Sequence, residues 1–249
     1  MISLKTPEEI EAIGRAGAII AALYRELPSR VEPGVSTKEL DVFAERFIRD
    51  HSGAEPAFKG LYGFPATLCT SINHEVVHGI PAERRRLGSG DVISLDCGVK
   101  LDGFFADAAI TVPVGEVAPE VQRLLEVTSA ALQRGIREAR PGNRLGDIGA
   151  AIQEPAEEAG YGIVRDLVGH GIGREPHEEP QVPNFGRPGR GMPLEIGLVL
   201  AIEPMFNLGT PSIRTLPDRW TVVTADRAVS AHFEHTVAVT PEGPKILTA

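Results

Sequence analysis

The sequence predicts a single α+β domain, in which helices pack against short strands. Four amphipathic helical segments are interspersed with six short β-like runs along the 249 residues. Apolar residues make up 42% of the chain and charged residues 24%, as in an ordinary globular protein. A chain of this length often folds as one unit around a sizeable core, so we expect one domain over 1–249.

The first two predicted helices begin with capping boxes, in which a hydroxyl residue precedes a glutamate by three positions. Thr6 and Glu9 form the first box, and Ser36 and Glu39 form the second. Apolar residues then recur on one face of each segment, and Gly53 ends the second helix. The other expected elements are helices over 119–139 and 144–159 and strands over 67–72, 92–96, 108–112, 198–203, 221–224 and 233–239.

The chain also repeats itself weakly, which indicates two related halves. A Pro-Gly pair at 33–34 recurs at 141–142, an offset of 108, and the run 90–96 recurs as 197–203, an offset of 107. Chance recurrence could explain either repeat alone, but two nearly equal offsets favour related halves. The expected halves span roughly 1–115 and 116–249.

The composition predicts a cytoplasmic protein that makes no membrane contact. No apolar run approaches the roughly 20 residues that span a bilayer, and the first residues match neither a signal peptide nor a transit peptide. Two cysteines, Cys69 and Cys97, fit a reducing compartment better than a disulfide scaffold. The net charge of −9 argues against an extended nucleic-acid surface, and the basic run 84–86 is more typical of a solvated turn.

Carboxylates lie on the smaller and more polar face of three predicted strands. Side-chain alternation groups Asp96 with Val92 and Ser94, and it places Glu203 and Glu234 on comparable faces. A lone charge in a poorly solvated place neutralises or finds a counter-charge, yet cationic residues are scarce nearby. Several anions that converge without arginine or lysine indicate a divalent-metal site.

Three of the seven histidines fall in or near glycine-flanked segments: His78, His170 and His177. Adjacent glycines let a backbone and a ligand approach closely, which a purely structural core histidine does not require. For one histidine alone, a satisfied polar residue of the core is the better interpretation. Together with the carboxylates, the three histidines favour a functional site.

Eight short motifs are spread over almost the whole chain. They are Ser71-Ile72-Asn73, His78-Gly79-Ile80-Pro81, Leu95-Asp96, Asp102-Gly103-Phe104-Phe105-Ala106-Asp107, Gly169-His170-Gly171-Ile172-Gly173, His177-Glu178-Glu179-Pro180-Gln181-Val182, Ile202-Glu203-Pro204-Met205 and Glu234-His235-Thr236. In these motifs the chain resembles the type I methionine aminopeptidases. The resemblance implies the pita-bread (creatinase/aminopeptidase) fold, a pseudo-twofold antiparallel sheet covered by helices, which would also account for the internal repeat.

The resemblance implies a centre of two divalent metal ions. Asp107 and Glu234 would bridge the metals, Asp96 would complete one site, and His170 and Glu203 would complete the other. Oxygen and nitrogen ligands suit Co, Mn, Fe or Zn without selecting among them. A bridging hydroxide would attack the first peptide carbonyl, because bound metal makes hydroxide available at neutral pH.

The resemblance also implies roles for residues beside the metals. Glu203 would carry the proton from the attacking water to the leaving amine. His177 would hydrogen-bond the carbonyl oxygen as it becomes anionic, and His78 would contact the scissile amide. Structural or solvated roles are expected instead for Glu178, Glu179, His51, His74, His232 and His235.

Specificity for methionine requires an apolar slot near the metals. By resemblance this slot would be lined by Phe58, Leu61, Phe64, Cys69 and Trp220, where soft or aromatic walls suit a thioether. Ordinary core packing is the alternative for each, and the slot is favoured for Cys69 and Trp220. Two positions depart from the family pattern: Pro176 stands where many members have Phe or Met, and Val77 where many have Cys.

The expected function is co-translational removal of the N-terminal methionine from nascent polypeptides with a small second residue. We expect a monomer that acts on nascent N-termini, with transient ribosome contact left open and no specific nucleic-acid partner. A prolidase or Xaa-Pro aminopeptidase has the same ligand order but usually an extra N-terminal domain, for which the position of Asp96 leaves no room. A binding module that has lost catalysis is the other alternative, but it should have broken ligands, and all five are present.

Overall fold

The computed structural model describes residues 2–249, which form four α-helices against a nine-stranded antiparallel sheet. Met1, the first residue of the predicted domain, lies outside the described residues. All four predicted helices are present within two or three residues of their expected bounds. They are α1 (Pro7–Glu26), α2 (Thr37–Arg49), α3 (Pro119–Glu138) and α4 (Leu145–Ala159).

Both predicted capping boxes form. The Glu9 N–H donates to Thr6 Oγ1 at 3.3 Å, and the Thr6 N–H donates to Glu9 Oε2 at 2.9 Å. Ser36 and Glu39 make the same reciprocal pair at the start of α2, with distances of 2.7 and 3.2 Å. Each box satisfies backbone donors that a helix leaves unpaired at its first turn, which explains where the two helices begin.

The large sheet has the order β1-β4-β5-β14-β9-β7-β8, with β2 paired to β4 and β15 paired to β14. Two three-stranded sheets, β13-β10-β6 and β11-β12-β3, accompany it. The strands are β1 (Glu55–Pro56), β2 (Leu68–Ile72), β3 (Glu75–Val77), β4 (Val92–Leu101), β5 (Phe104–Pro113), β6 (Gly162–Ile163), β7 (Gly169–Gly171), β8 (Glu178–Val182), β9 (Val199–Ile202), β10 (Met205–Asn207), β11 (Ile213–Thr215), β12 (Val222–Thr224), β13 (Ser230–His232), β14 (Glu234–Thr240) and β15 (Gly243–Ile246). Short 3₁₀ helices occupy Leu27–Arg30 and Leu61–Gly63.

The strands predicted over 92–96 and 108–112 are longer than expected and join as one hairpin. Asp102 and Gly103 form its two-residue turn, with φ angles of 51° and 80°. Asp-Gly pairs favour such turns because both positions need positive φ. The signal for this hairpin was therefore present in the sequence at Asp102-Gly103.

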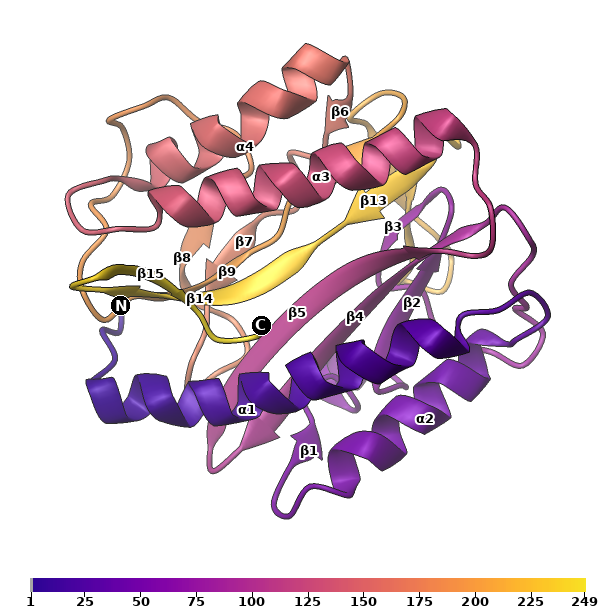
Figure 1. Cartoon of the computed structure of the whole chain (residues 1–249), viewed down its shortest axis with the longest axis horizontal. Helices are drawn as coiled ribbons and strands as arrows, with labels where there is room; N and C mark the ends of the chain where they lie inside the picture. Colours follow the sequence, from indigo (N-terminus) through magenta and orange to yellow (C-terminus); the bar gives the residue numbers. More distant parts are fainter. Residues whose placement is uncertain (1) are drawn as a thin grey trace.

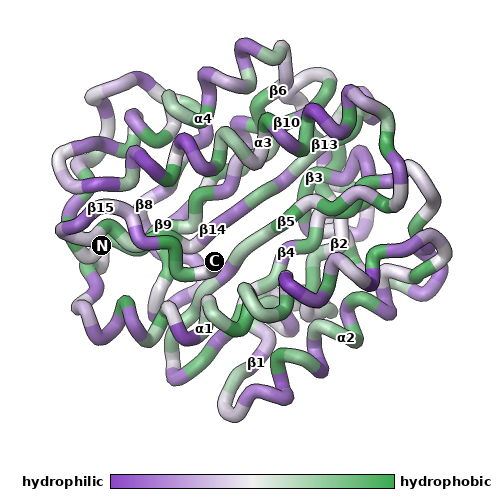
Figure 2. Tube along the Cα trace, viewed as in Figure 1, coloured by the Kyte–Doolittle hydropathy of each residue, from purple (hydrophilic) through white to green (hydrophobic). Residues whose placement is uncertain are grey.

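Two hydrophobic cores lie beneath two pairs of helices. Helices α1 and α2 lie over the β4 and β5 side of the sheet, and α3 and α4 lie over the β9 and β14 side (Figure 1). In Figure 2, hydrophilic and hydrophobic residues are interspersed along α1 and α3, as expected for helices that bury one face. The predicted fold, an antiparallel sheet covered by helices, is confirmed, and we propose that the two halves meet near residue 115.

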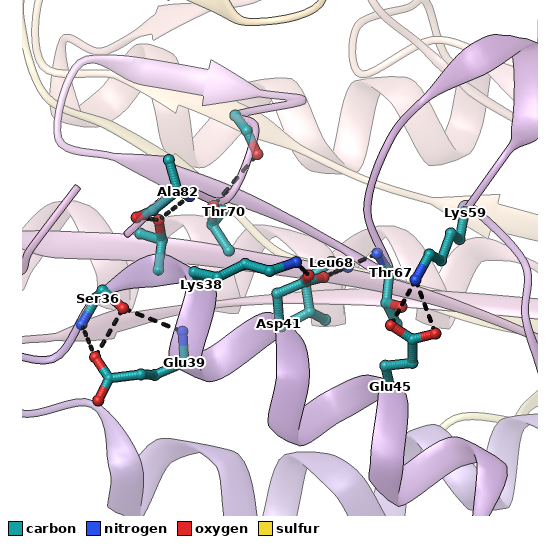
Figure 3. A network of polar contacts seen from close by, with 12 residues as sticks. Ser36, Lys38, Glu39, Asp41, Glu45, Lys59, Thr67, Leu68, Thr70 and Ala82 are labelled. Carbon is teal, nitrogen blue, oxygen red and sulfur yellow. Dashed lines mark hydrogen bonds and ion pairs between the residues drawn. The ribbon is translucent and has the colours of Figure 1, made fainter. Parts of the chain in front are cut away.

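Helix α2 holds the start of strand β2 through the buried carboxylate of Asp41. Asp41 Oδ1 accepts the N–H groups of Thr67 at 2.8 Å and Leu68 at 3.0 Å, and Lys38 Nζ donates to its Oδ2 at 2.7 Å (Figure 3). One turn further along the helix, Glu45 accepts from Lys59 Nζ at 2.7 Å. Helix α2 thereby anchors both β2 and the loop that precedes it.

Asp41→Ala is expected to lower the free energy of unfolding by about 2–4 kcal/mol, because two buried backbone donors lose their acceptor. Urea unfolding of the variant measures this loss. Asp50→Ala is the matched control, since Asp50 caps the C-terminal end of the same helix, with a side chain that is 70% exposed and lies 3.8 Å from Arg46. The control should change stability by less than about 0.5 kcal/mol. Equal effects of the two substitutions would contradict the anchoring role.

Candidate metal centre and substrate cavity

Strands β4, β5 and β14 bring three of the predicted ligands onto one face of the sheet. Asp96 on β4 and Glu234 on β14 each lie directly opposite Ala109, from either side of β5. Asp107 precedes Ala109 by two residues and so points to the same face. The small side chain of Ala109 leaves room among these three carboxylates.

The other two predicted ligands come from β7 and the end of β9. His170 lies opposite Ala201, and Ala201 in turn lies opposite Thr236 on β14. Glu203 follows two residues after Ala201, just beyond the end of β9. The Thr236 hydroxyl contacts Asp107 Oδ1 at 3.1 Å, which joins the two groups of ligands across the sheet.

The structure brings the five predicted ligands together around one cavity. His170 Nε2 lies 3.5 Å from Asp107 Oδ2 and 3.7 Å from Glu203 Oε1. One ligand atom each of Asp107, His170 and Glu234 lies within 4.8 Å of the other two. Asp96 is 8% exposed, and Asp107 and Glu234 are each 3% exposed. Four carboxyl groups and an imidazole thus share a small space with little exposure to solvent.

Burial raises the pKa of the four carboxyl groups. Loss of solvation raises the pKa of Asp96 to about 8, an effect that nearby His232 opposes and Asp107 strengthens. Burial likewise raises the pKa of Glu203 to about 8, against the opposing effect of His170. The pKa values of Asp107 and Glu234 are also raised, first by burial. Without a positive ion, Asp96 and Glu203 retain protons near neutral pH.

The donor set fits divalent metal. Asp96 Oδ1 is buried and has no hydrogen-bond partner among residues 2–249, so this acceptor remains for an external group. Within the same range, neither lysine nor arginine forms an ion pair with any of the five predicted ligands. Carboxylate oxygens and an imidazole nitrogen are the donors that divalent first-row metals accept. A cation would supply the missing counter-charge.

Glycines on both sides of His170 allow its strand to pack closely. A Cβ on Gly169 would overlap the Ala201 carbonyl oxygen, and a Cβ on Gly171 would overlap that of Glu179. The His170 ring donates a 2.9 Å hydrogen bond from Nδ1–H to the Gly171 carbonyl oxygen, which leaves the Nε2 lone pair facing the carboxylates. The flanking glycines therefore allow the neighbouring backbone to approach the strand that carries His170, as the sequence indicated.

Two further histidines line the cavity. Burial lowers the pKa of His78 to about 4, with a contribution from His232. Burial and then His170 lower the pKa of His177 to about 4 as well. The His78 ring lies edge-on to Trp220 at 6.4 Å between centroids, and the His177 ring lies 4.6 Å from that of His170. Both imidazoles are neutral at physiological pH, so each can donate one hydrogen bond and accept another.

A cavity of about 300 Å³ opens beside the ligands. Cys69 lies directly opposite Asp96 in the β2–β4 pairing, and Phe64 packs edge-to-face on Trp220 at 5.1 Å. Its apolar wall consists of Phe58, Leu61, Tyr62, Phe64, Cys69, Val77, Leu167, Val168, Met205 and Trp220. All five residues predicted for the methionine slot lie along this wall. Pro176 is buried outside this lining.

His232 lies in the cavity, although a structural role was expected for it. It is 2% exposed, its Nε2 lies 3.6 Å from Glu203 Oε2, and neither ring nitrogen has a hydrogen-bond partner among residues 2–249. The signal was available, because His232 precedes Glu234 by two positions and so shares its face. By contrast, His51 bonds the Phe47 carbonyl through Nδ1 at 2.9 Å, as a structural residue does. His235 bonds Thr248 Oγ1 in the same way, at 2.9 Å.

Comparison with known proteins agrees with this site. Residues 11–241 match the model of metallopeptidase family M24. The methionine aminopeptidase of Clostridium perfringens is 53% identical over 248 residues, which cover 100% of this chain and 99% of that protein. The chain therefore belongs to metallopeptidase family M24. Its predicted membership of the methionine aminopeptidases is confirmed.

Solved structures separate two branches of the fold. The crystal structure of the methionine aminopeptidase from Rickettsia prowazekii superposes with a TM-score of 0.97 at 42% identity and covers 100% of both chains. The prolidase from Pyrococcus furiosus has a TM-score of 0.79 at 24% identity, and the match covers 99% of this chain but 65% of that one. The prolidase shares the fold, whereas the methionine aminopeptidase matches over its full length.

Among the helices formed by residues 2–249, none combines the length and apolar character that crossing a bilayer requires.

The metal-free protein is expected to lose stability as the pH rises from about 5 to about 8. The four carboxyl groups bind protons more tightly when folded than when unfolded, where their pKa is about 4. Their contribution is therefore present at low pH and lost as the pH rises through the folded pKa of about 8 for Asp96 and Glu203. Thermal unfolding of chelator-treated protein at both pH values measures this loss.

Adding Mn²⁺ should raise Tm more at the higher pH, because the cation replaces protons at the same groups. For a chain of this size, each kcal/mol changes Tm by roughly 2–4 °C. A Tm increase that is the same at both pH values would contradict the assignment of the buried carboxylates to the metal centre.

Proposed function

We propose that this chain removes the N-terminal methionine from nascent polypeptides in the cytoplasm and prefers a small second residue. Two divalent metal ions would be held by Asp96, Asp107, His170, Glu203 and Glu234. The observation that carries the proposal is one cavity that combines five converging ligands with a soft apolar wall. The 53% identity to a methionine aminopeptidase supports the same activity. The protein would act as a monomer, with the ribosome as a transient partner.

The apolar wall suits an unbranched thioether side chain. Phe64, Trp220 and the thiol of Cys69 offer polarisable surfaces, and sulfur–aromatic contacts are favourable. The cavity volume of about 300 Å³ is at the lower end of the range for small-molecule sites, which favours one side chain over an extended segment. The side chain of the substrate methionine would therefore lie against this apolar wall, and the second residue of the substrate would lie toward the opening of the cavity.

When bound, the two cations would supply a water molecule of lowered pKa and polarise the scissile carbonyl group. Glu203, as a carboxylate once cations are bound, would take up a proton and deliver it to the leaving amine, since it lies among the converging ligands with Oε1 3.7 Å from His170 Nε2. His177 would donate a hydrogen bond to the carbonyl oxygen as negative charge develops there. His78 would contact the scissile amide from the side of Trp220.

Metal-stripped protein titrated with Mn, Fe, Co or Zn should regain hydrolysis of Met-Ala-Ser. Met-Leu, with its larger second residue, should be cleaved more slowly, and Ala-Pro should not be cleaved. Chromatographic measurement of the released N-terminal amino acid gives the rate of each of the three reactions. Cleavage of Ala-Pro without cleavage of Met-Ala-Ser would favour a prolidase, and no turnover with any metal would favour a binding module.

Asp96→Asn should remove one of two tightly bound metal ions, because the amide lacks the negative charge that the site needs. Isothermal titration of the metal-free variant with Mn²⁺ measures the stoichiometry. Asp102→Asn is the matched control on the same hairpin, since the Asp102 side chain is 62% exposed and pairs with Arg15 at 3.3 Å. The control should bind as the unmodified protein does. If Asp96→Asn still binds two ions with unchanged affinity, the ligand set is wrong.

A further inference from the structure

The loop Gly173–Glu178 carries His177 to the edge of the cavity. The His177 ring stacks on Tyr62 at 6.1 Å and lies edge-on to His170 at 4.6 Å between centroids. The position of the imidazole therefore depends on these two ring contacts and on the backbone of its loop.

One carboxylate closes that loop on itself. Glu178 Oε1 accepts the N–H of Arg174 at 2.8 Å and the N–H of Glu175 at 3.2 Å. Its other oxygen, Oε2, accepts a hydrogen bond from Lys5 Nζ at 2.7 Å. A residue from the N-terminal segment thus holds the carboxylate that defines the conformation of the loop.

Lys5 has little freedom to move. Its side chain is 1% exposed, and Nζ also donates to the Ser3 carbonyl at 3.0 Å. Its backbone N–H donates to the Gly197 carbonyl at 2.7 Å. A Cβ on Gly173 would overlap Lys5 Cε, so the lysine stem lies against the start of the loop at a distance that only glycine permits.

A second contact ties the loop to helix α1 but lies in solvent. Arg174 Nη2 pairs with Glu9 Oε1 at 2.7 Å, and the guanidinium group lies 4.6 Å from the centre of the Phe104 ring. The Arg174 side chain is 63% exposed, and exposed ion pairs hold geometry weakly. The pair of Lys5 and Glu178 is buried, and removing one member of a buried pair leaves an uncompensated charge. The buried pair therefore dominates the position of the loop.

We propose that Lys5 and Glu178 form a positioning pair that holds the loop Gly173–Glu178 so that the His177 ring faces the reacting carbonyl. This inference rests on the proposed function, in which His177 stabilises the developing negative charge. Neither member of the pair belongs to the lining of the cavity among residues 2–249, so the pair acts through His177. Loosening it should impair the chemical step while the five ligands and the apolar wall stay in place.

Lys5→Met tests the pair, because methionine keeps the length of the stem and removes the charge. Hydrolysis of Met-Ala-Ser by the Mn²⁺-loaded protein should show kcat reduced about tenfold or more, with KM changed less than about twofold, since a misplaced group costs mainly transition-state stabilisation. Mn²⁺ binding, measured by calorimetry, should stay unchanged. Amide hydrogen exchange at Arg174 and Glu175 should become faster.

Arg15→Met is the matched control. It removes another cation of the N-terminal region, from an ion pair with Asp102 whose side chains are 56% and 62% exposed. Its kinetics and loop exchange should match those of the unmodified protein. If Lys5→Met does not fold, Glu178→Gln tests the same pair from the other side, because glutamine keeps the shape and removes the charge.

Combination with His177→Ala separates positioning from a general structural effect. If Lys5 acts through His177, then Lys5→Met should cause no further loss of kcat in the His177→Ala background. A double variant that loses the product of the two single effects would overturn the proposal. Unchanged kinetics in both Lys5→Met and Glu178→Gln, beside an impaired His177→Ala, would overturn the positioning pair alone.

Failure of the proposed function gives a different result. If the unmodified metal-loaded protein cleaves no methionine peptide, that function and the positioning role fall together. If it cleaves normally and His177→Ala retains full kcat, the role of His177 is wrong, and the pair has no catalytic group to position.

Discussion

The burial of four converging carboxyl groups is the constraint on which the rest of the structure depends. Asp96, Asp107 and Glu234 share one face of the sheet, Glu203 lies just beyond the end of β9, and burial makes each negative charge costly. A chain that places such groups together must hold them rigidly, since any relaxation would move them toward water. The long β4–β5 hairpin and the pairing of β14 with both β5 and β9 supply that rigidity.

The two helix pairs stabilise this arrangement from the opposite face. On β4, Ile93 and Leu95 belong to the core beneath α1 and α2, while the intervening Ser94 and Asp96 face the site. Leu200 and Ile202 on β9 belong in the same way to the core beneath α3 and α4. Each pair of helices thus covers the hydrophobic face of strands that hold carboxylates on their polar face.

Features set by local chemistry were predictable from the sequence, and features set by distant pairing were not. The capping boxes at Thr6 and Ser36 depend on residues three apart, so both helix starts were predicted. The short strand that carries His170 has only three residues, and it exists because β8 and β9 flank it. His232 shows another limit of prediction from sequence. Side-chain alternation places it on the same face as Glu234, but its closeness to Glu203 follows from the pairing of β13 with β10.

Because β4 and β5 are joined by the two-residue Asp102-Gly103 turn, the number of residues between Asp96 and Asp107 decides whether both side chains lie on the same face of the hairpin. Asp107 lies opposite Gly98, two residues from Asp96, so both side chains point into the site. One inserted or deleted residue between them would reverse the faces of every residue after it on β5. Asp107 would then point into the apolar core beneath α1, and an alanine would take its place in the cavity, Ala106 after an insertion and Ala108 after a deletion. Single-residue length changes in this hairpin are thus forbidden by geometry, even though its turn is exposed to solvent.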